Sequence, residues 1–156
     1  FDWAMKRLNA SGLRETLDDL AMNRGTPILG ICVGMQILGA RSEEGELPGL
    51  GWIPGEVRRL GHPDCAAAMV LPHMGWNDVE PVSANGLLSG LGNARFYFLH
   101  SYGFHCASEA HVLAWTDYYG SFASVIGSGN VYGVQFHPEK SHDWGYRLLR
   151  NFAEAA

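Results

Sequence analysis

The chain has 156 residues, of which 47% are apolar and 17% charged, so it can bury the core of one domain (1–156) and is not disordered. A formal net charge of −5, without a Lys/Arg cluster, argues against nucleic acid as the main partner. No apolar run reaches the roughly 18 residues of a membrane span, no signal peptide is visible, and three cysteines suit a reducing compartment, so we expect a cytoplasmic protein.

The first forty residues alternate between helical and strand patterns. Residues 2–23 carry leucines at helical spacing, with Gly12 as a break or joint and Gly25 as the stop. The apolar segment 26–31 predicts a buried strand of the kind found in parallel sheets, and residues 33–40 predict the next helix. This order of elements indicates an α/β crossover.

The rest of the chain predicts mainly strands, followed by one amphipathic helix at 143–155. Strands are predicted at 55–60, 67–73, 94–104, 111–118, 121–129 and 130–137. We therefore expect an α/β fold, a three-layer α/β/α domain with a mostly parallel central sheet, helices on both faces and an antiparallel extension from the middle strands.

Cys32 lies between Gly30 and Gly34 at the end of the predicted strand 26–31. The pattern resembles a nucleophile elbow, in which flanking glycines permit a sharp turn that exposes the nucleophile. A following helix N-terminus would favour the thiolate, and it would point backbone N–H groups at an oxyanion. The alternative is a small buried structural cysteine. Cys65 and Cys106 lack such a turn and are interpreted as ordinary thiols.

A cysteine nucleophile requires a base, and His137 at the end of the strand 130–137 is the best candidate. On an extended segment Glu139 would face the same side and could orient the imidazole, as the third member of a triad does. A strand-end histidine with a solvated glutamate is the alternative. A metal site is disfavoured because no second ligand pair has a suitable spacing. His73 and His100 are interpreted as structural or interface residues.

Two motifs together resemble those of the class I (triad) glutamine amidotransferases, namely "GICVGMQ" and "GVQFHPEKS". Four further motifs resemble the branch of glutaminase subunits of imidazole glycerol phosphate synthase: "RSEEG", "GLGWIPGEV", "LPHMGWN" and "YFLHSY". The resemblance runs across nearly the whole chain in the same order. It implies the flavodoxin-like amidotransferase fold, histidine biosynthesis as the pathway, and neither metal nor organic cofactor.

The resemblance also implies a mechanism. Cys32 would attack the side-chain amide of glutamine, His137 would move the proton to the departing ammonia, and Glu139 would orient His137. Water would then hydrolyse the γ-glutamyl thioester. Further roles are carried over to two oxyanion donors and four substrate-binding residues: Val33 and Gly34, then Gln36, Glu44, Ser101 and Tyr102. Without the family, these polar residues would be interpreted as ordinary exposed or strand-end positions.

The family implies that ammonia passes to a synthase (cyclase) barrel subunit, with which the chain forms a heterodimer. Lys140 and the segment 72–77, interpreted as a loop, resemble the face that meets this partner. The residues concerned are Pro72, His73, Met74, Trp76 and Asn77. Locally, the segment could equally be a turn with a half-buried tryptophan.

The chain departs from the family pattern at its start. It begins at Phe1 in a predicted helix, so we expect that N-terminal strands and a glycine-rich loop are missing. That loop supplies part of the oxyanion hole, and one lost donor costs about 10²–10³ in rate, so we expect weak activity of this portion alone. Three alternatives stay open: a paralogous subunit supplying ammonia for surface-polysaccharide sugars, a stand-alone γ-glutamyl hydrolase or cysteine peptidase, and a non-catalytic docking module.

Overall fold

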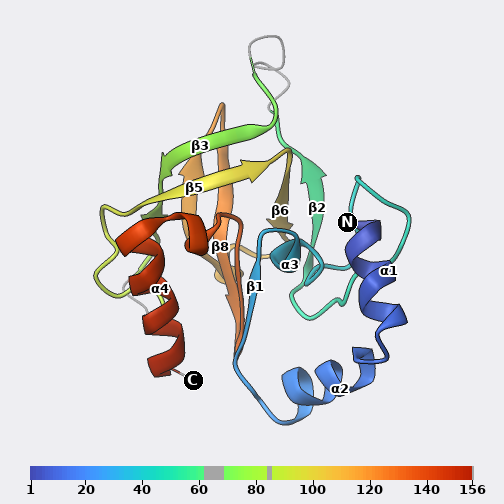
Figure 1. Cartoon of the computed structure of the whole chain (residues 1–156). Helices are drawn as coiled ribbons and strands as arrows, with labels where there is room; N and C mark the ends of the chain where they lie inside the picture. Colours follow the sequence, from blue (N-terminus) through green and yellow to red (C-terminus); the bar gives the residue numbers. More distant parts are fainter. Residues whose placement is uncertain (62–68, 84–85, 156) are drawn as a thin grey trace.

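The computed structural model describes residues 1–61, 69–83 and 86–155 and combines strands with helices (Figure 1). The strands are β1 (Ile28–Ile31), β2 (Gly55–Arg59), β3 (His73–Asp78), β4 (Glu80–Pro81), β5 (Arg95–His100), β6 (Tyr102–Cys106), β7 (Val112–Asp117), β8 (Ser121–Ser128) and β9 (Val131–Val134). The helices are α1 (Asp2–Ala10), α2 (Arg14–Asp18), α3 (Val33–Gln36) and α4 (His142–Ala155), with shorter turns η1 (Asp19–Asn23), η2 (Glu109–His111) and η3 (Pro138–Lys140).

The main sheet has seven strands, in the order β1-β9-β8-β6-β2, with β7 beside β8 and β4 beside β7. Its β1–β9 ladder is parallel, and its other ladders among the described strands are antiparallel. The expectation of a mostly parallel sheet is therefore wrong, although the α/β class is confirmed. The reason is connectivity: β7, β8 and β9 follow one another through tight turns, which can join only antiparallel neighbours.

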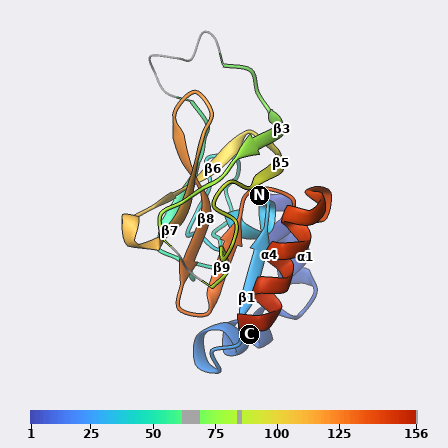
Figure 2. The same ribbon diagram turned by 90° about the vertical axis from the view of Figure 1, so that its left-hand side faces the viewer.

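The N-terminal helical segment is broken where the sequence predicts a joint. Gly12, with φ of 73°, separates α1 from α2, and Gly25, with φ of 64°, follows the π-helical turn η1. Both angles lie in the left-handed region that glycine adopts readily. In Figure 2, α1 and α4 are seen to the right, next to β1, and the strand β7 of the main sheet is seen at the left.

The predicted helix 33–40 is much shorter than expected, because α3 ends at Gln36. Beyond it the chain turns towards β2, where the Ala40 N–H donates to the Gly55 carbonyl oxygen at 3.0 Å. A side chain at Gly39 would meet the Phe104 ring at 2.8 Å, so the turn passes directly against β6.

A second, two-stranded sheet is formed by β3 and β5. We call this pair the ribbon. The segment 72–77, predicted as a loop, is mostly the strand β3, which pairs with β5 in the antiparallel register His73–His100 to Asp78–Arg95. The strand predicted at 67–73 is wrong for Met69–Pro72, and residues 67–68 lie outside the described ones. The strand predicted at 94–104 divides at Ser101, where the chain passes from the ribbon into the main sheet.

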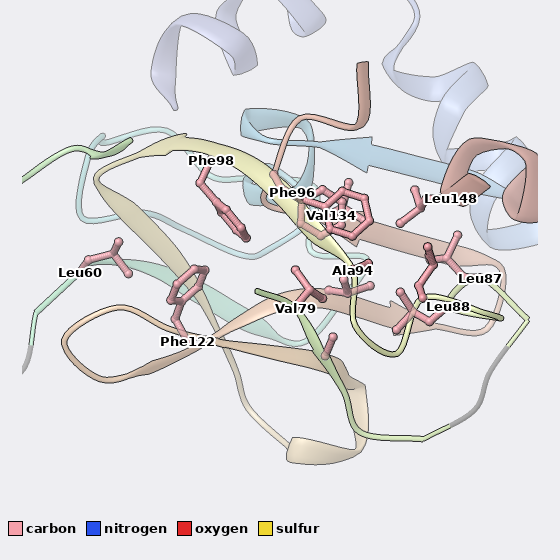
Figure 3. Packing of buried hydrophobic residues seen from close by; sticks show 14 residues of the cluster. Leu60, Val79, Leu87, Leu88, Ala94, Phe96, Phe98, Phe122, Val134 and Leu148 are labelled. Atoms are coloured by element: carbon pink, nitrogen blue, oxygen red, sulfur yellow. The ribbon is translucent and has the colours of Figure 1, made fainter. Parts of the chain in front are cut away.

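Two apolar clusters form the core. The first lies between the ribbon, β8, β9 and α4, and includes the stacked rings of Phe96 and Phe136, with centroids 3.9 Å apart (Figure 3). The second joins α1 and α3 to the sheet through Met5, Met35 and Phe104. Together they fix β1, β9 and β5, the three strands that carry the candidate site.

None of the helices among the described residues is long and apolar enough to cross a membrane.

Candidate active site

Cys32 occupies a strained turn between β1 and α3, with φ of 52° and ψ of −111°. Its N–H still continues the parallel ladder and donates to the Val134 carbonyl oxygen at 2.8 Å. A Cβ at Gly30 would lie 2.5 Å from the Gly34 carbonyl oxygen, so the first glycine of the motif is required by close backbone approach. A Cβ at Gly34 would meet nothing within 4 Å, so the second glycine is not required sterically. A non-glycine residue held at positive φ stores about 1–3 kcal/mol of strain, as is common at nucleophiles.

The half-buried Cys32 thiol is not activated in this state. Burial raises its pKa above the ordinary value, and the negative charges of Glu139 and Glu44 add to this. The Val33 backbone N–H and the positive charge of Lys140 lower the pKa but do not offset the burial. The expectation of a low thiol pKa is therefore wrong for this state. The physical reason is that α3 is only four residues long and the sulfur is partly withdrawn from water.

His137 and Glu139 lie together as the sequence predicts, although on a different backbone. Nδ1 of His137 lies 2.7 Å from Oε1 of Glu139. The segment is the 3₁₀ turn η3 rather than an extended strand, with the Lys140 N–H donating to the His137 carbonyl oxygen at 3.0 Å. Because a carboxylate only accepts, Nδ1 carries the proton, and Nε2 is left as the basic nitrogen.

Strand β5 brings the two halves of the site together. The Cys32 sulfur lies 3.9 Å from the Leu99 carbonyl oxygen, and the His137 N–H donates to the Tyr97 carbonyl oxygen at 2.8 Å. Two residues of a strand span about 7 Å, so Cys32 and His137 contact β5 at positions about that far apart. Among the described residues, the hydrogen-bond partners of the sulfur are the Leu99 carbonyl oxygen and Nε2 of Gln135, not His137. A hydrogen bond between nucleophile and base is often long before substrate binds.

Two residues that the sequence analysis did not identify hold η3 in place. The buried Ser141 hydroxyl donates to the His137 carbonyl oxygen at 2.6 Å and accepts from the Tyr97 N–H at 2.9 Å. A Cβ at Gly145, in the first turns of α4, would lie 1.8 Å from the Pro138 carbonyl oxygen. Helix α4 therefore packs directly on the turn that carries His137 and Glu139.

Gln36 lies beneath the elbow and is only 5% exposed. Its Nε2 donates to the Tyr102 carbonyl oxygen at 3.0 Å and to Oε1 of Gln135 at 3.2 Å. Both hydrogens of Nε2 are therefore used, and a contact of Gln36 with glutamine would have to involve Oε1. Tyr102 and Ser101 stand at the passage between the ribbon and the main sheet, both half-buried.

The remaining predicted binding residues are more exposed. Glu44 is exposed, and its Oε2 lies 2.8 Å from the nitrogen of Phe1. Val33 is 37% exposed beside the sulfur, and Gly34 is half-buried within α3.

The outer face of the ribbon is apolar and exposed, and it lies next to the site. Met74 is 64%, Trp76 40% and Leu99 38% exposed. Trp76 packs edge-to-face against Tyr97 and stacks on His142, and the Lys140 ammonium lies 5.9 Å from the Tyr97 ring centre. Pro72, at the start of β3, is also exposed. We call Met74, Trp76, Tyr97, Leu99 and Lys140 the docking face.

Alternation along β3 turns His73 and Asn77 to the opposite side. His73 is only 3% exposed, so its assignment to a partner interface is corrected: it belongs to the core. It lies 3.0 Å from His100, and Asn77 lies 3.3 Å from the other nitrogen of His73. Burial lowers the pKa of both histidines to about 4, so neither is a base near neutral pH. The series of hydrogen bonds ends at His100, whose Nδ1 donates to the Tyr102 carbonyl oxygen at 2.8 Å.

Cys106 lies at the end of β6 and not at a turn between a strand and a helix. Burial raises the pKa of Cys106 to about 11, as expected of an ordinary thiol, and Cys65 lies outside the described residues. Among the residues that the structure describes, no three His, Cys, Asp or Glu side chains converge on a possible metal position.

Comparison with known proteins agrees with this geometry. The family model "Glutamine amidotransferase class-I" matches residues 7–156. A curated relative from Bdellovibrio bacteriovorus, "Imidazole glycerol phosphate synthase subunit HisH", is 54% identical over 99% of this chain and 76% of its own length. The protein of that name from Leptospira interrogans is 48% identical over 98% of this chain and 76% of its own.

Solved structures agree on the fold. One titled "Crystal structure of glutamine amidotransferase" superimposes with a TM-score of 0.71 at 24% identity, covering 96% of this chain and 70% of its own. A glutamine amidotransferase from Thermotoga maritima gives a TM-score of 0.60 at 23% identity, covering 91% of this chain and 51% of its own. The chain thus spans about three quarters of the curated relatives and about half of the Thermotoga maritima protein.

Proposed function

Because this chain belongs to the class I glutamine amidotransferases, and among them to the HisH subunits of imidazole glycerol phosphate synthase, we propose that Cys32, His137 and Glu139 hydrolyse glutamine to glutamate and ammonia. The whole chain acts as part of one glutaminase domain in the cytoplasm. The observation that carries the proposal is that the strained Cys32 turn and the segment with His137 and Glu139 contact β5 at residues only two apart, Leu99 and Tyr97.

The reaction begins at the Cys32 sulfur. His137 Nε2 takes the thiol proton as the sulfur attacks the amide carbon of glutamine, and the same nitrogen returns the proton to the leaving amine, which departs as ammonia. A water molecule, deprotonated by Nε2, then hydrolyses the γ-glutamyl thioester to glutamate and restores the thiol. Glu139 accepts from Nδ1–H and stabilises the imidazolium formed in each half of the reaction.

The raised thiol pKa supports a concerted role for the base. A thiol that is not ionised beforehand needs a proton acceptor in the step itself, and Nε2 is the basic nitrogen left by the Glu139 contact. The Val33 N–H already faces the sulfur, which supports an oxyanion role for it, with Gly34 as the second candidate.

Substrate recognition is proposed for Gln36 through Oε1, for the Glu44 carboxylate on the α-ammonium group, and for the Ser101–Tyr102 segment. The exposed Glu44 carboxylate carries the negative charge that pairs with such a group.

We assign the synthase barrel subunit to the docking face. Exposed Met74 and Trp76 supply the apolar anchors typical of an interface core, and Lys140 supplies a positive charge at its edge. The face lies on the ribbon that also contacts Cys32 and His137, so ammonia formed there would be released beside the partner. Pro72 lies at its edge, whereas Asn77 contributes from the inner side only.

The test is glutamine hydrolysis by the full-length protein, with and without the histidine-pathway barrel subunit. Activity that rises with the barrel, disappears in Cys32→Ala and falls about 10²–10⁴-fold in His137→Ala would support the proposal. Activity that depends on Cys32 but ignores this barrel would favour the polysaccharide branch or a stand-alone hydrolase. No hydrolysis under any condition would refute the glutaminase.

A further inference from the structure

A buried chain of polar groups ends at the Cys32 sulfur. Gln135, the residue after β9, is fully buried, and its Nε2 lies 3.9 Å from the sulfur. On its other side, Oε1 of Gln135 accepts from Nε2 of Gln36 at 3.2 Å. Burying an amide side chain next to an apolar strand costs free energy unless its polar groups are paired, so each contact of Gln135 needs an explanation.

A backbone carbonyl fixes the orientation of the Gln36 amide, and that amide in turn fixes the orientation of Gln135. The Tyr102 carbonyl oxygen can only accept, so Gln36 must present Nε2 to it, as it does at 3.0 Å. The second hydrogen of that Nε2 points at Gln135, which must answer with Oε1. Gln135 therefore turns its own Nε2, a pure donor, towards the sulfur.

We propose that Gln135 donates a hydrogen bond to the Cys32 thiolate when it forms, and that Gln36 is the positioning residue that holds the Gln135 amide in this donor orientation. The inference rests on the proposed glutaminase function, because it concerns the same nucleophile, and deepens it.

The surroundings of the sulfur explain why such a donor matters. The Leu99 carbonyl oxygen, 3.9 Å away, can accept from a thiol but repels a thiolate. Glu139 and Glu44 also disfavour negative charge there, whereas Lys140 and the Val33 N–H favour it. A buried N–H aimed at the sulfur interacts more favourably with the thiolate than with the thiol, so it stabilises the charge at the moment that it develops.

The test measures thiolate formation without glutamine. The rate of iodoacetamide alkylation at Cys32, followed by peptide mass spectrometry, is recorded against pH in the full-length protein. Gln135→Met removes the donor at similar volume. Gln135→Glu keeps the acceptor for Gln36 but turns a carboxyl oxygen towards the sulfur. Asn130→Asp is the matched control, because Asn130 also donates from an amide to two backbone carbonyls, those of Ala21 and Thr26, away from the site.

We expect alkylation at pH 8 to slow about tenfold in both Gln135 variants, with the midpoint of the pH profile about one unit higher. Gln36→Met should raise the midpoint by a smaller amount and slow alkylation about threefold, because the Gln135 N–H is still present but its orientation is no longer fixed by Gln36. The Asn130→Asp rate should stay within about twofold of the unaltered protein, since the two hydrogen bonds of a half-buried amide are lost without a change near the sulfur.

An unaltered alkylation profile in Gln135→Met would overturn the proposal, and if that variant does not fold, an unaltered profile in Gln135→Glu would do so. The outcome is independent of the glutaminase assay. If the alkylation profile changes in the Gln135 variants but the protein hydrolyses no glutamine, the proposed function is refuted and the proposed hydrogen bond is supported. Normal hydrolysis with an unaltered profile would refute the hydrogen bond alone.

Discussion

Replacing Gly145 by alanine has two opposite effects on the stability of α4, one from helix propensity and one from a steric clash. Alanine is favoured over glycine inside a helix by about 1 kcal/mol, so helix propensity alone predicts a more stable α4. However, the new Cβ would lie 1.8 Å from the Pro138 carbonyl oxygen, where real contacts essentially never fall below 3.0 Å. Because the obstacle is backbone, α4 or η3 must move by at least about 1.2 Å.

The consequence is expected in catalysis more than in stability. Overpacking costs about 1–3 kcal/mol, which the gain in helix propensity partly offsets, so we expect a loss of about 0–2 kcal/mol in the free energy of unfolding. A displacement of about 1 Å at a catalytic group costs about 10²-fold in rate, and η3 carries both His137 and Glu139.

The assay is kcat for glutamine hydrolysis with the barrel subunit bound, next to chemical denaturation of the same sample. Gly92→Ala is the matched control, because its Cβ would meet nothing within 4 Å. It should leave kcat unchanged. A Gly145→Ala protein whose kcat stays within threefold of the unaltered one would show that the position of η3 does not govern catalysis.

Three further predictions concern the supporting residues. Ser141→Ala should cost about 1–3 kcal/mol in denaturation and about tenfold in kcat, because the two hydrogen bonds of the buried Ser141 hydroxyl to His137 and Tyr97 are lost. Ser124→Ala, also buried but with one bond of 3.3 Å away from the site, should lower stability alone, and equal effects on kcat would contradict the assignment. The folded protein resists protonation of its buried histidine pair, whose pKa values are about 4, while the unfolded chain takes up these protons near pH 6.5. Urea denaturation should therefore show stability falling from about pH 6.5 to about 4, with a shallower fall in His73→Asn; an equally steep fall would oppose this reasoning. In calorimetry, Met74→Ser should weaken barrel binding at least fivefold, whereas Val82→Ser, equally exposed but away from the docking face, should not, and equal affinities would exclude the face.

The site could be predicted to the extent that its chemistry is local in sequence. The Cys32 turn follows from glycines two residues before and after the cysteine at the end of an apolar strand, and the His137–Glu139 contact joins residues two apart. Short-range geometry leaves few options in both cases. The contact between His137 and Glu139 is therefore predicted correctly, although the segment is predicted as extended and is the turn η3.

The sheet could not be predicted in the same way, because strand pairing joins distant segments. Alternation reads the same in parallel and antiparallel ladders, and the apolar β1 resembles a strand from a parallel sheet whether it has one parallel neighbour or several. The strand β3 is predicted as a loop because glycine and asparagine are turn residues, while its partner β5 supplies the pairing that overrides them.

The missing positioning residues act through contacts that no local pattern reveals. Gly145 matters because of Pro138 in another element, and Ser141 because of Tyr97. For Gln135 one signal was available, since a polar residue at a core-facing position of an apolar strand requires a partner. The prediction of a low thiol pKa is wrong because burial, which sequence does not show, outweighs the short helix α3.

The ribbon could open locally while the main sheet stays folded, so the assembled site has its own free energy of opening. A two-stranded sheet is marginal in water by itself, so β3 and β5 depend on packing against the rest of the protein. Cys32 comes from the seven-stranded sheet, whereas the backbone that holds η3 comes from β5. Opening of the ribbon would therefore separate the nucleophile from its base while β8 and β9 stay paired. Hydrogen exchange at the amides of β3 and β5 would report this opening, and a bound barrel would slow that exchange to the same degree that it protects the assembled site.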